Sequence, residues 1–259
     1  MMHMEITLRS TALGMDTKIT VLFPEDRHAT TDTRGKKYPV LYVLNGGKED
    51  CSSWVNLSTL FLNCRDLDLV VVLPSGNNSS YCDEKYGQKY FTWISQELPV
   101  KMKNLFPITD DPDQTFIMGE SMGGYGTARI ALACPDNYGK AVVLSGGNFQ
   151  PFAFGESNER IGIFGSQQEW EQSDNNLFNL VEKLKHHQGH KPDMIFYCGT
   201  EDRALAPCQE LEQRIRTECP DVRVTAEYWH GQHNFFFWNE AIPKALKEFG
   251  FDIVQNSVV

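Results

Sequence analysis

The sequence predicts an α/β fold: a mostly parallel, doubly wound sheet with antiparallel N-terminal strands and helices on both faces. Short runs that are apolar throughout, such as residues 39–44 and 69–73, are typical of strands buried on both faces. These runs alternate with longer segments in which apolar residues recur at helical spacing. Such alternation is typical of parallel strands joined by right-handed helical crossovers.

The first half of the chain begins with two segments that alternate apolar and polar residues, the pattern of an antiparallel pair at a sheet edge. Polar runs over residues 25–37 and 77–87 are predicted to be surface loops. Strands are expected over 4–10, 18–23, 39–44 and 69–73, and helices over 54–63 and 91–106, the second with a kink at Pro99.

The second half continues the alternation. Strands are expected over 116–118, 141–144, 194–198 and 222–229, and helices over 122–133, 177–187, 207–217 and 234–249. Residues 148–172 show no clean period and are rich in aromatic residues and glycine. Because this segment follows a central strand, we expect it to form a small cap or a wall of the substrate pocket.

Length and composition indicate one domain. The 259 residues contain no linker-like tract and no internal repeat, so we expect a single domain over residues 1–259. A net charge of -10 argues against nucleic acid or an anionic membrane surface as partner. No stretch approaches the roughly 18 consecutive apolar residues that a membrane span needs.

The cysteine pattern predicts the compartment. The seven cysteines are scattered, with no CxxC pair and no metal-ligand spacing. The first residues also lack the basic-then-apolar pattern of a secretion signal, so we expect reduced thiols and a cytoplasmic protein. His186, His187 and His190 cluster near a predicted helix end, but no carboxylate or cysteine ligand set accompanies them, and we expect no metal ion there.

The predicted site is organised around residues 116–126, an apolar strand followed by GESMG at residues 119–123 and the start of a helix. A serine at a sharp strand-to-helix turn has a strained backbone and an exposed hydroxyl, which suits Ser121 to be a nucleophile. The N–H of Met122, at the helix N-terminus, then points toward negative charge that develops on a bound carbonyl. By itself, the pentapeptide is also compatible with an ordinary glycine-rich turn.

A serine hydroxyl is a weak nucleophile, so the site requires a histidine base and a carboxylate that orients it. On a parallel sheet these groups follow the carboxyl ends of strands, in the chain order Ser, Asp, His. Asp202 lies past the turn at Gly199, and we favour it over the adjacent Glu201, although Asp202 could instead cap a helix. The other competing acids are Asp193 and Asp221, which precede their strands, and Asp252.

The base is predicted to be His233. It lies beyond Gly231, in a loop that can bring its ring to the serine, whereas His230 directly follows an apolar strand and is expected to be partly buried. Acyl transfer also requires a second oxyanion donor, from the turn after the third strand. We predict the N–H of Gly47 for this role, although two consecutive glycines also suit a plain tight turn.

Four stretches match one family pattern: LNGG at 44–47 with Trp54, GESMGGYG at 119–126, CGTED at 198–202, and GQHNFFFW at 231–238. Tyr86-Gly87 and residues 97–99 fit the same pattern. The chain therefore resembles the esterase D, or putative esterase, family over most of its length, with the greatest likeness to bacterial tributyrin-esterase-like enzymes.

The resemblance implies an α/β-hydrolase fold and a serine carboxylesterase that hydrolyses short-chain acyl esters, including acetylated sugars and activated aryl esters. It assigns Ser121 as nucleophile, Asp202 and His233 as its partners, and Gly47 and Met122 as oxyanion donors. It implies a small-molecule ester substrate, no cofactor, and a homo-oligomer.

The sequence departs from the family pattern in three places. The family has His-Gly where Asn45-Gly46 stands, and asparagine can replace the histidine as a hydrogen-bonding side chain. Asn234 stands where an acidic residue is common. Relatives that hydrolyse S-formylglutathione carry a cysteine soon after the His-Gly; Cys51 lies at a different offset, which argues against that substrate.

The pocket is less well defined by the sequence. Trp54, Tyr86 and Trp238 are candidates for its lining, and each is also a candidate for ordinary packing. Glu120 is expected to pack near the nucleophile rather than to act as the acid. The chain has no long apolar lid insertion, which favours a short acyl group.

The sequence leaves two alternatives to ester hydrolysis. One is acyl transfer to an alcohol other than water, as in mycolyltransferase-like relatives, which a secretion signal would favour. The other is a catalytically inactive hydrolase fold that serves as a binding module. The intact set of Ser121, Asp202 and His233 argues against the second, because a decayed site has no chemical reason to keep all three.

Overall fold

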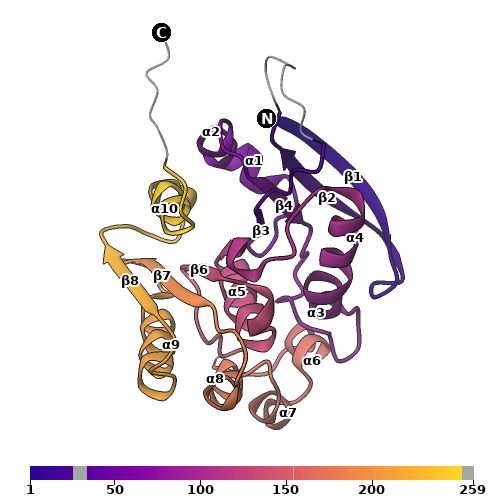
Figure 1. Cartoon of the computed structure of the whole chain (residues 1–259). Coiled ribbons are helices and arrows are strands. Elements are labelled where there is room, and N and C mark those ends of the chain that lie inside the picture. The colour runs from indigo at the N-terminus through magenta and orange to yellow at the C-terminus, as the bar shows by residue number, and fades with distance from the viewer. Residues whose placement is uncertain (26–33, 154, 253–259) are drawn as a thin grey trace.

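The computed structural model describes residues 1–25, 34–153 and 155–252. An eight-stranded sheet with the order β1-β2-β4-β3-β5-β6-β7-β8 runs through the molecule (Figure 1). The strands are β1 (Met2–Ser10), β2 (Met15–Phe23), β3 (Val40–Leu44), β4 (Val70–Pro74), β5 (Thr115–Glu120), β6 (Lys140–Leu144), β7 (Asp193–Gly199) and β8 (Val224–Trp229). All neighbouring pairs from β4 to β8 are parallel, whereas β2 is antiparallel to both β1 and β4. The predicted mostly parallel sheet with antiparallel N-terminal strands is thereby confirmed.

Helices lie on both faces of the sheet, as predicted (Figure 1). The α-helices of the described residues are α1 (Ser53–Leu57), α2 (Leu60–Cys64), α3 (Tyr90–Thr92), α4 (Leu98–Leu105), α5 (Met122–Ala133), α6 (Asn158–Phe164), α7 (Gln167–Gln172), α8 (Leu177–His186), α9 (Leu205–Glu218) and α10 (Phe235–Glu248). A π-helical turn, η1 (Trp93–Glu97), joins α3 to α4, and short 3-10 turns lie at η2 (Pro112–Gln114) and η3 (Pro135–Asn137).

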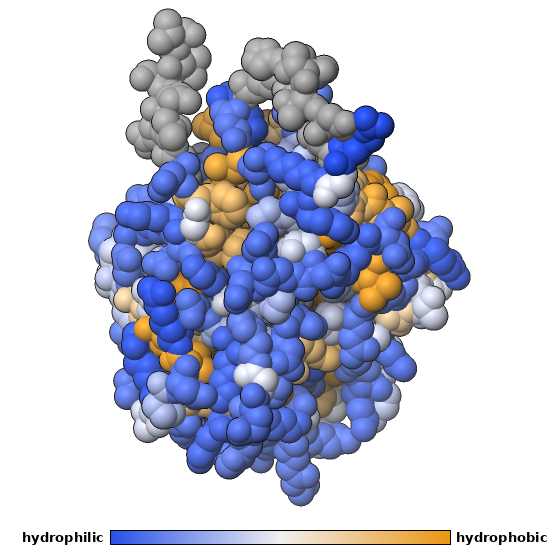
Figure 2. Space-filling model, in the orientation of Figure 1, coloured by the Kyte–Doolittle hydropathy of each residue, from blue (hydrophilic) through white to orange (hydrophobic). Residues whose placement is uncertain are grey.

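Two hydrophobic layers sandwich the sheet, and alternate residues of each strand enter opposite layers. In β3, Tyr42 and Leu44 pack in the layer that includes α5, α8 and α9, while Leu41 and Val43 pack in the layer that includes α1, α2 and α10. Burial on both faces explains why these strands are apolar throughout. The face of the molecule seen in Figure 2 is mostly hydrophilic, with apolar residues in small separate groups.

Two predicted helices differ in detail from those observed. The segment predicted as one helix over 54–63 is divided into α1 and α2 at Ser58, whose backbone is extended. The helix predicted over 91–106 is divided into α3, η1 and α4, and Pro99 lies in the first turn of α4, two residues after η1 ends. Proline has no N–H to donate to the preceding turn, and a wider π-helical turn accommodates that loss.

The segment over 148–172 was predicted without secondary structure, yet it contains α6 and α7. Both helices are short, and each begins at a serine that caps it: Ser157 for α6 and Ser166, with Glu169, for α7. The predicted loop over 25–37 lies mostly outside the described residues. A single domain over the whole chain stays a prediction. No helix among the described residues has the length and apolar character to cross a bilayer.

Candidate active site

Ser121 occupies a sharp turn between β5 and α5. Its backbone φ is 55°, in the left-handed region that few residues other than glycine adopt. The turn can form because α5 approaches the sheet closely: a Cβ on Gly123 would lie 2.4 Å from the carbonyl oxygen of Leu44. Ser121 therefore lies at the carboxyl edge of the sheet with its side chain in the cavity that is described below.

The structure brings Ser121, His233 and Asp202 together, as the sequence predicts. The Nε2 atom of His233 lies 2.8 Å from the Oγ of Ser121. The Nδ1 atom of His233 lies 2.8 Å and 3.0 Å from the two carboxyl oxygens of Asp202. The acid contacts the far side of the imidazole, so the ring is held with Nε2 directed at the serine.

The carboxylate of Asp202 is buried and accepts several hydrogen bonds. The Asp202 side chain is fully buried, and burial by itself would raise its pKa. Hydrogen bonds from His233, from the backbone of Ala204 and from Ser145 outweigh this effect, and the net pKa is lowered. Asp202 is therefore an anion at neutral pH that can stabilise an imidazolium. It also accepts from the Ala204 N–H at 2.8 Å, so the predicted capping role exists beside the contact with His233.

Ser145 and Trp238 support this pair. Trp238 donates its indole N–H to the hydroxyl of Ser145 at 2.9 Å, and its ring meets His233 edge-on with centroids 5.3 Å apart. Ser145 follows β6 and has a positive φ of 48°. Ser145 is not among the predicted site residues; its place at a strand's carboxyl end is the one signal that the sequence offers, and an ordinary turn gives the same signal.

Two backbone amides face the cavity without partners. Gly47 and Met122 both line it, and neither N–H donates a hydrogen bond to any described residue. Met122 is the first residue of α5, where N–H groups have no partner within the helix. These are the two donors predicted for an oxyanion.

Asn45 fixes the loop that carries Gly47. The side chain is buried, and its amide nitrogen donates to the carbonyl oxygens of Gly46 at 2.7 Å and Glu49 at 3.0 Å. Its oxygen accepts from the N–H of Gly76 at 2.9 Å and the hydroxyl of Tyr81 at 3.1 Å. Asn45, which stands where the family pattern described above has histidine, therefore connects three segments at the carboxyl edge of the sheet by hydrogen bonds.

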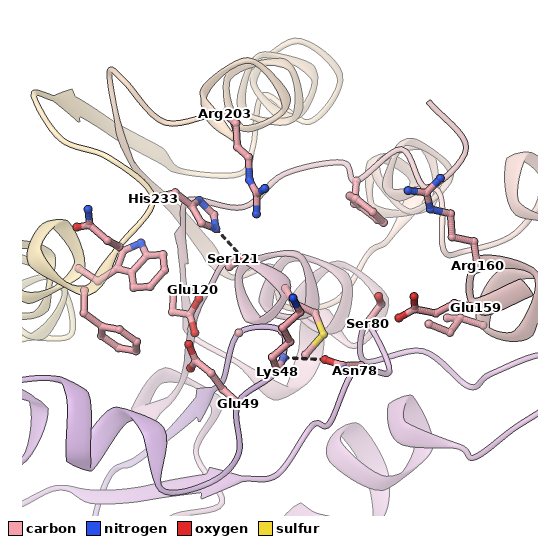
Figure 3. A pocket seen from close by; sticks show the side chains of 18 of the residues that line it. Lys48, Glu49, Asn78, Ser80, Glu120, Ser121, Glu159, Arg160, Arg203 and His233 are labelled. Carbon is pink, nitrogen blue, oxygen red and sulfur yellow. Dashed lines mark hydrogen bonds between the residues drawn. The ribbon is translucent and has the colours of Figure 1, made fainter. Parts of the chain in front are cut away.

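A cavity of about 620 Å³ lies over Ser121 (Figure 3). Its size is in the range of small-molecule sites. The apolar part of its lining comprises Met122, Phe149, Ile163, Phe164, Phe235 and Trp238. Of these residues, Phe149, Ile163 and Phe164 belong to the segment over 148–172.

The three predicted lining residues have different positions. Trp238 lines the cavity. Trp54 does not: it is buried, donates its indole N–H to the carbonyl oxygen of Leu44 at 3.0 Å, and packs edge-on against Phe235. Tyr86 is 75% exposed and lines a neighbouring cavity of about 320 Å³. The packing reading is therefore correct for Trp54, and Tyr86 lies beside the cavity rather than in it.

Glu120 and Glu49 face one another beside the nucleophile (Figure 3). Glu120 is fully buried, and a Cβ on Gly46 would lie 2.5 Å from its carboxyl oxygens. Burial raises the pKa of Glu120 well above its usual value, and the nearby Glu49 raises it further. Burial also raises the pKa of Glu49.

The side chains of His186, His187 and His190, which are close in the sequence, contact different groups. His186 contacts Glu182 at 3.1 Å, His187 contacts Asp136 at 3.0 Å, and the His190 ring lies 2.9 Å from the carbonyl oxygen of Tyr138. Within the described ranges, no three His, Cys, Asp or Glu side chains converge as metal ligands would. His230, expected to be partly buried, has a side chain that is 83% exposed, and its ring lies 3.5 Å from Glu201.

Comparison with known proteins gives evidence about the family of this chain that does not depend on the geometry of the site. The family model described as "Putative esterase" matches residues 10–249. An acetyl esterase from Caldicellulosiruptor saccharolyticus is 28% identical over 268 residues, which cover 94% of this chain and 96% of that protein.

Two solved structures from Staphylococcus aureus superpose over nearly the whole chain. The fluorophosphonate-binding serine hydrolase FphF, with substrate bound, gives a TM-score of 0.87 at 26% identity and covers 97% of this chain and 99% of its own. The S-formylglutathione hydrolase FrmB gives a TM-score of 0.83 at 25% identity and covers 96% and 98%.

Proposed function

Since this chain belongs to the putative esterase family, and is thus an α/β-hydrolase-fold carboxylesterase, we propose that it hydrolyses short-chain acyl esters through a Ser121–His233–Asp202 triad. The observation that carries the proposal is the continuous hydrogen-bond chain from the Ser121 hydroxyl through His233 to Asp202.

The proposed reaction proceeds through an acyl-enzyme. His233 Nε2 accepts the hydroxyl proton as Ser121 Oγ attacks the ester carbonyl carbon, and Asp202 stabilises the imidazolium that results. Collapse of the tetrahedral intermediate breaks the bond to the alcohol oxygen, which takes the proton from His233. Water then attacks the acyl-enzyme by the same route and releases the carboxylic acid.

The N–H groups of Gly47 and Met122 hold the oxyanion in both halves of this reaction. Amides that are already fixed and free of other partners need no reorganisation when charge develops. The loss of one oxyanion donor typically costs ~10²–10³ in kcat. Asn45, which anchors the loop of Gly47, has an indirect, positioning role.

The test is hydrolysis of p-nitrophenyl esters from acetate to decanoate by the wild type and by Ser121→Ala. We expect the variant to lose at least ~10⁴-fold in kcat with an unchanged melting temperature, because the oxyanion site alone supplies only the residual rate. Ser52→Ala, which lies outside the cavity lining, serves as the matched control and should keep wild-type rates. Activity that survives Ser121→Ala would refute the mechanism, and equal turnover of acetate and decanoate would refute the short-acyl preference.

S-formylglutathione hydrolysis is the second candidate. It is supported by the similarity to the solved S-formylglutathione hydrolase, and the position of Cys51 argues against it. A kcat/KM for S-formylglutathione that exceeds the value for p-nitrophenyl acetate by a hundredfold or more would favour this candidate. Acyl transfer is distinguished by adding an alcohol acceptor and looking for the new ester as product.

The family resemblance further leads us to propose a homo-oligomer, and the scattered cysteines lead us to propose a cytoplasmic location. Sedimentation velocity should then give a mass that is a multiple of the 29.5 kDa chain. A single 29.5 kDa species at micromolar concentration would contradict the oligomer.

A further inference from the structure

Two cationic side chains at the cavity have no counter-ion. Lys48 and Arg203 line the cavity, and neither side chain forms an ion pair or hydrogen bond within the described part of the chain. Both residues are solvent-exposed, so their charges are available to a bound molecule.

The two cations enter the cavity from opposite sides. Lys48 belongs to the loop after β3, which its backbone N–H fixes by a 2.7 Å hydrogen bond to the side chain of Asn78. Arg203 directly follows Asp202 in the loop after β7. Figure 3 shows both charged ends directed into the space above Ser121.

The acidic residues of the cavity do not neutralise these charges. Glu120 is fully buried against Gly46, and it faces Glu49 rather than either cation. Burial raises the pKa of both glutamates, which favours the uncharged form of each. Glu159 lies at the far side of the cavity, beside Arg160, whose guanidinium donates to the carbonyl oxygen of Gly155 at 2.7 Å.

We propose that Lys48 and Arg203 bind an anionic group on the leaving alcohol of the substrate, so that the natural substrates are acyl esters of alcohols that bear a carboxylate or a phosphate. This inference rests on the proposed esterase mechanism. The guanidinium of Arg203 can bind a carboxylate or a phosphate through two parallel hydrogen bonds, and the ammonium of Lys48 adds a second positive charge.

The position of Arg203 places the anion on the alcohol rather than on the acyl group. The leaving oxygen must face Nε2 of His233, since it takes its proton from that atom. Arg203 directly follows Asp202, which holds this ring, and it lines the cavity together with His233, so we place the part of the substrate that extends from the leaving oxygen on the Arg203 side.

The experiment compares 4-acetoxybenzoate with its neutral isostere 4-acetoxybenzamide. We expect the wild type to favour the anion by about tenfold or more in kcat/KM, the size of a charge-assisted contact. The preference should fall at high salt. In Arg203→Gln and Lys48→Gln the ratio of the two kcat/KM values should fall toward one, and in Arg203→Glu it should fall below one. Arg9→Gln, on β1 and outside the cavity lining, is the matched control and should keep the wild-type ratio.

A wild-type ratio near one would overturn the proposal, as would an unchanged ratio in Arg203→Gln. A preference for mono-4-nitrophenyl succinate over its neutral amide, with none for 4-acetoxybenzoate, would overturn the placement on the alcohol.

Failure of the esterase mechanism can be told apart from failure of this subsite by a binding measurement. Calorimetric titration of Ser121→Ala with 4-hydroxybenzoate detects the subsite without any chemistry. Binding that weakens about tenfold when Arg203→Gln is added supports the subsite even if the mechanism is wrong.

Discussion

Ser121, Asp202 and His233 could be identified from the sequence because each follows a predicted strand and has a side chain suited to acyl transfer. Ser145 could not be distinguished in the same way, since a serine before two glycines is typical of any turn. Its hydrogen bond comes from Trp238, 93 residues further along the chain, and only the fold brings the two together. Lys48 and Arg203 were missed for a similar reason: an unpaired charge is a property of the surroundings, not of a motif.

Glu120 has an environment that its sequence neighbourhood does not reveal. Neither carboxyl oxygen has a hydrogen-bond partner of normal geometry among the described residues, and the side chain is fully buried. An uncompensated buried carboxylate is costly, so the protonated form is favoured in the folded state.

This environment predicts how Glu120→Gln changes the pH dependence of stability. Because the folded-state pKa is raised above the usual 4.5, the folded protein binds more protons than the unfolded chain as pH rises above this value. The free energy of unfolding of the wild type should therefore fall with rising pH, by up to about 1.4 kcal/mol per pH unit for this group. Glutamine does not titrate, so the variant should gain stability relative to wild type as the pH rises above about 4.5, as measured by urea denaturation.

Glu49→Gln should change the pH profile of stability in the same direction as Glu120→Gln, because the pKa of Glu49 is also raised in the folded protein. Parallel stability profiles for wild type and Glu120→Gln across this pH range would show that Glu120 is not held in its neutral form.

At the level of the elements, α5 was predicted with its observed bounds, and all the strands were predicted to within a few residues. Burial on both faces makes the strand sequences apolar throughout, and the motif at residues 119–123 marks the start of α5, so both are recognisable in the sequence. The short helices α6 and α7 were missed because six or seven residues span less than two full turns and show no clear period. The division between α1 and α2 was missed because Asn239 of α10 accepts a hydrogen bond from Thr59, 180 residues earlier.

The contact between α5 and the sheet predicts the effect of Gly123→Ala. The added methyl group would meet the backbone of Leu44, which cannot rotate away, so α5 must move from β3. We expect a loss of roughly 1–3 kcal/mol in the free energy of unfolding, and a fall in kcat because Ser121 moves with the helix.

Gly162→Ala provides the matched control for that substitution. Gly162 lies in α6, has no heavy atom within 4 Å of an added Cβ, and should gain about 0.4–1 kcal/mol through its lower unfolded-state entropy. Equal effects of the two substitutions would show that close packing against Leu44 is not what constrains Gly123.

For the whole molecule, the sequence predicted reduced thiols, and the structure has seven free cysteines. Six are buried and Cys134 is partly exposed. In non-reducing guanidinium chloride we expect all seven to react with Ellman's reagent, whereas in the native protein only Cys134 should react quickly. Fewer than seven reactive thiols in the denatured protein would reveal a disulfide and contradict the expected reducing compartment.

The asparagine at position 45 has a consequence for the range of acidity over which the enzyme can work. A histidine there would gain a proton near neutral pH, and a protonated ring can no longer accept a hydrogen bond. An amide never ionises under these conditions, so the bonds to Gly76 and Tyr81 persist in mildly acidic surroundings. With asparagine at this position, the loop that carries Gly47 therefore lacks one group whose protonation could disturb it in mild acid.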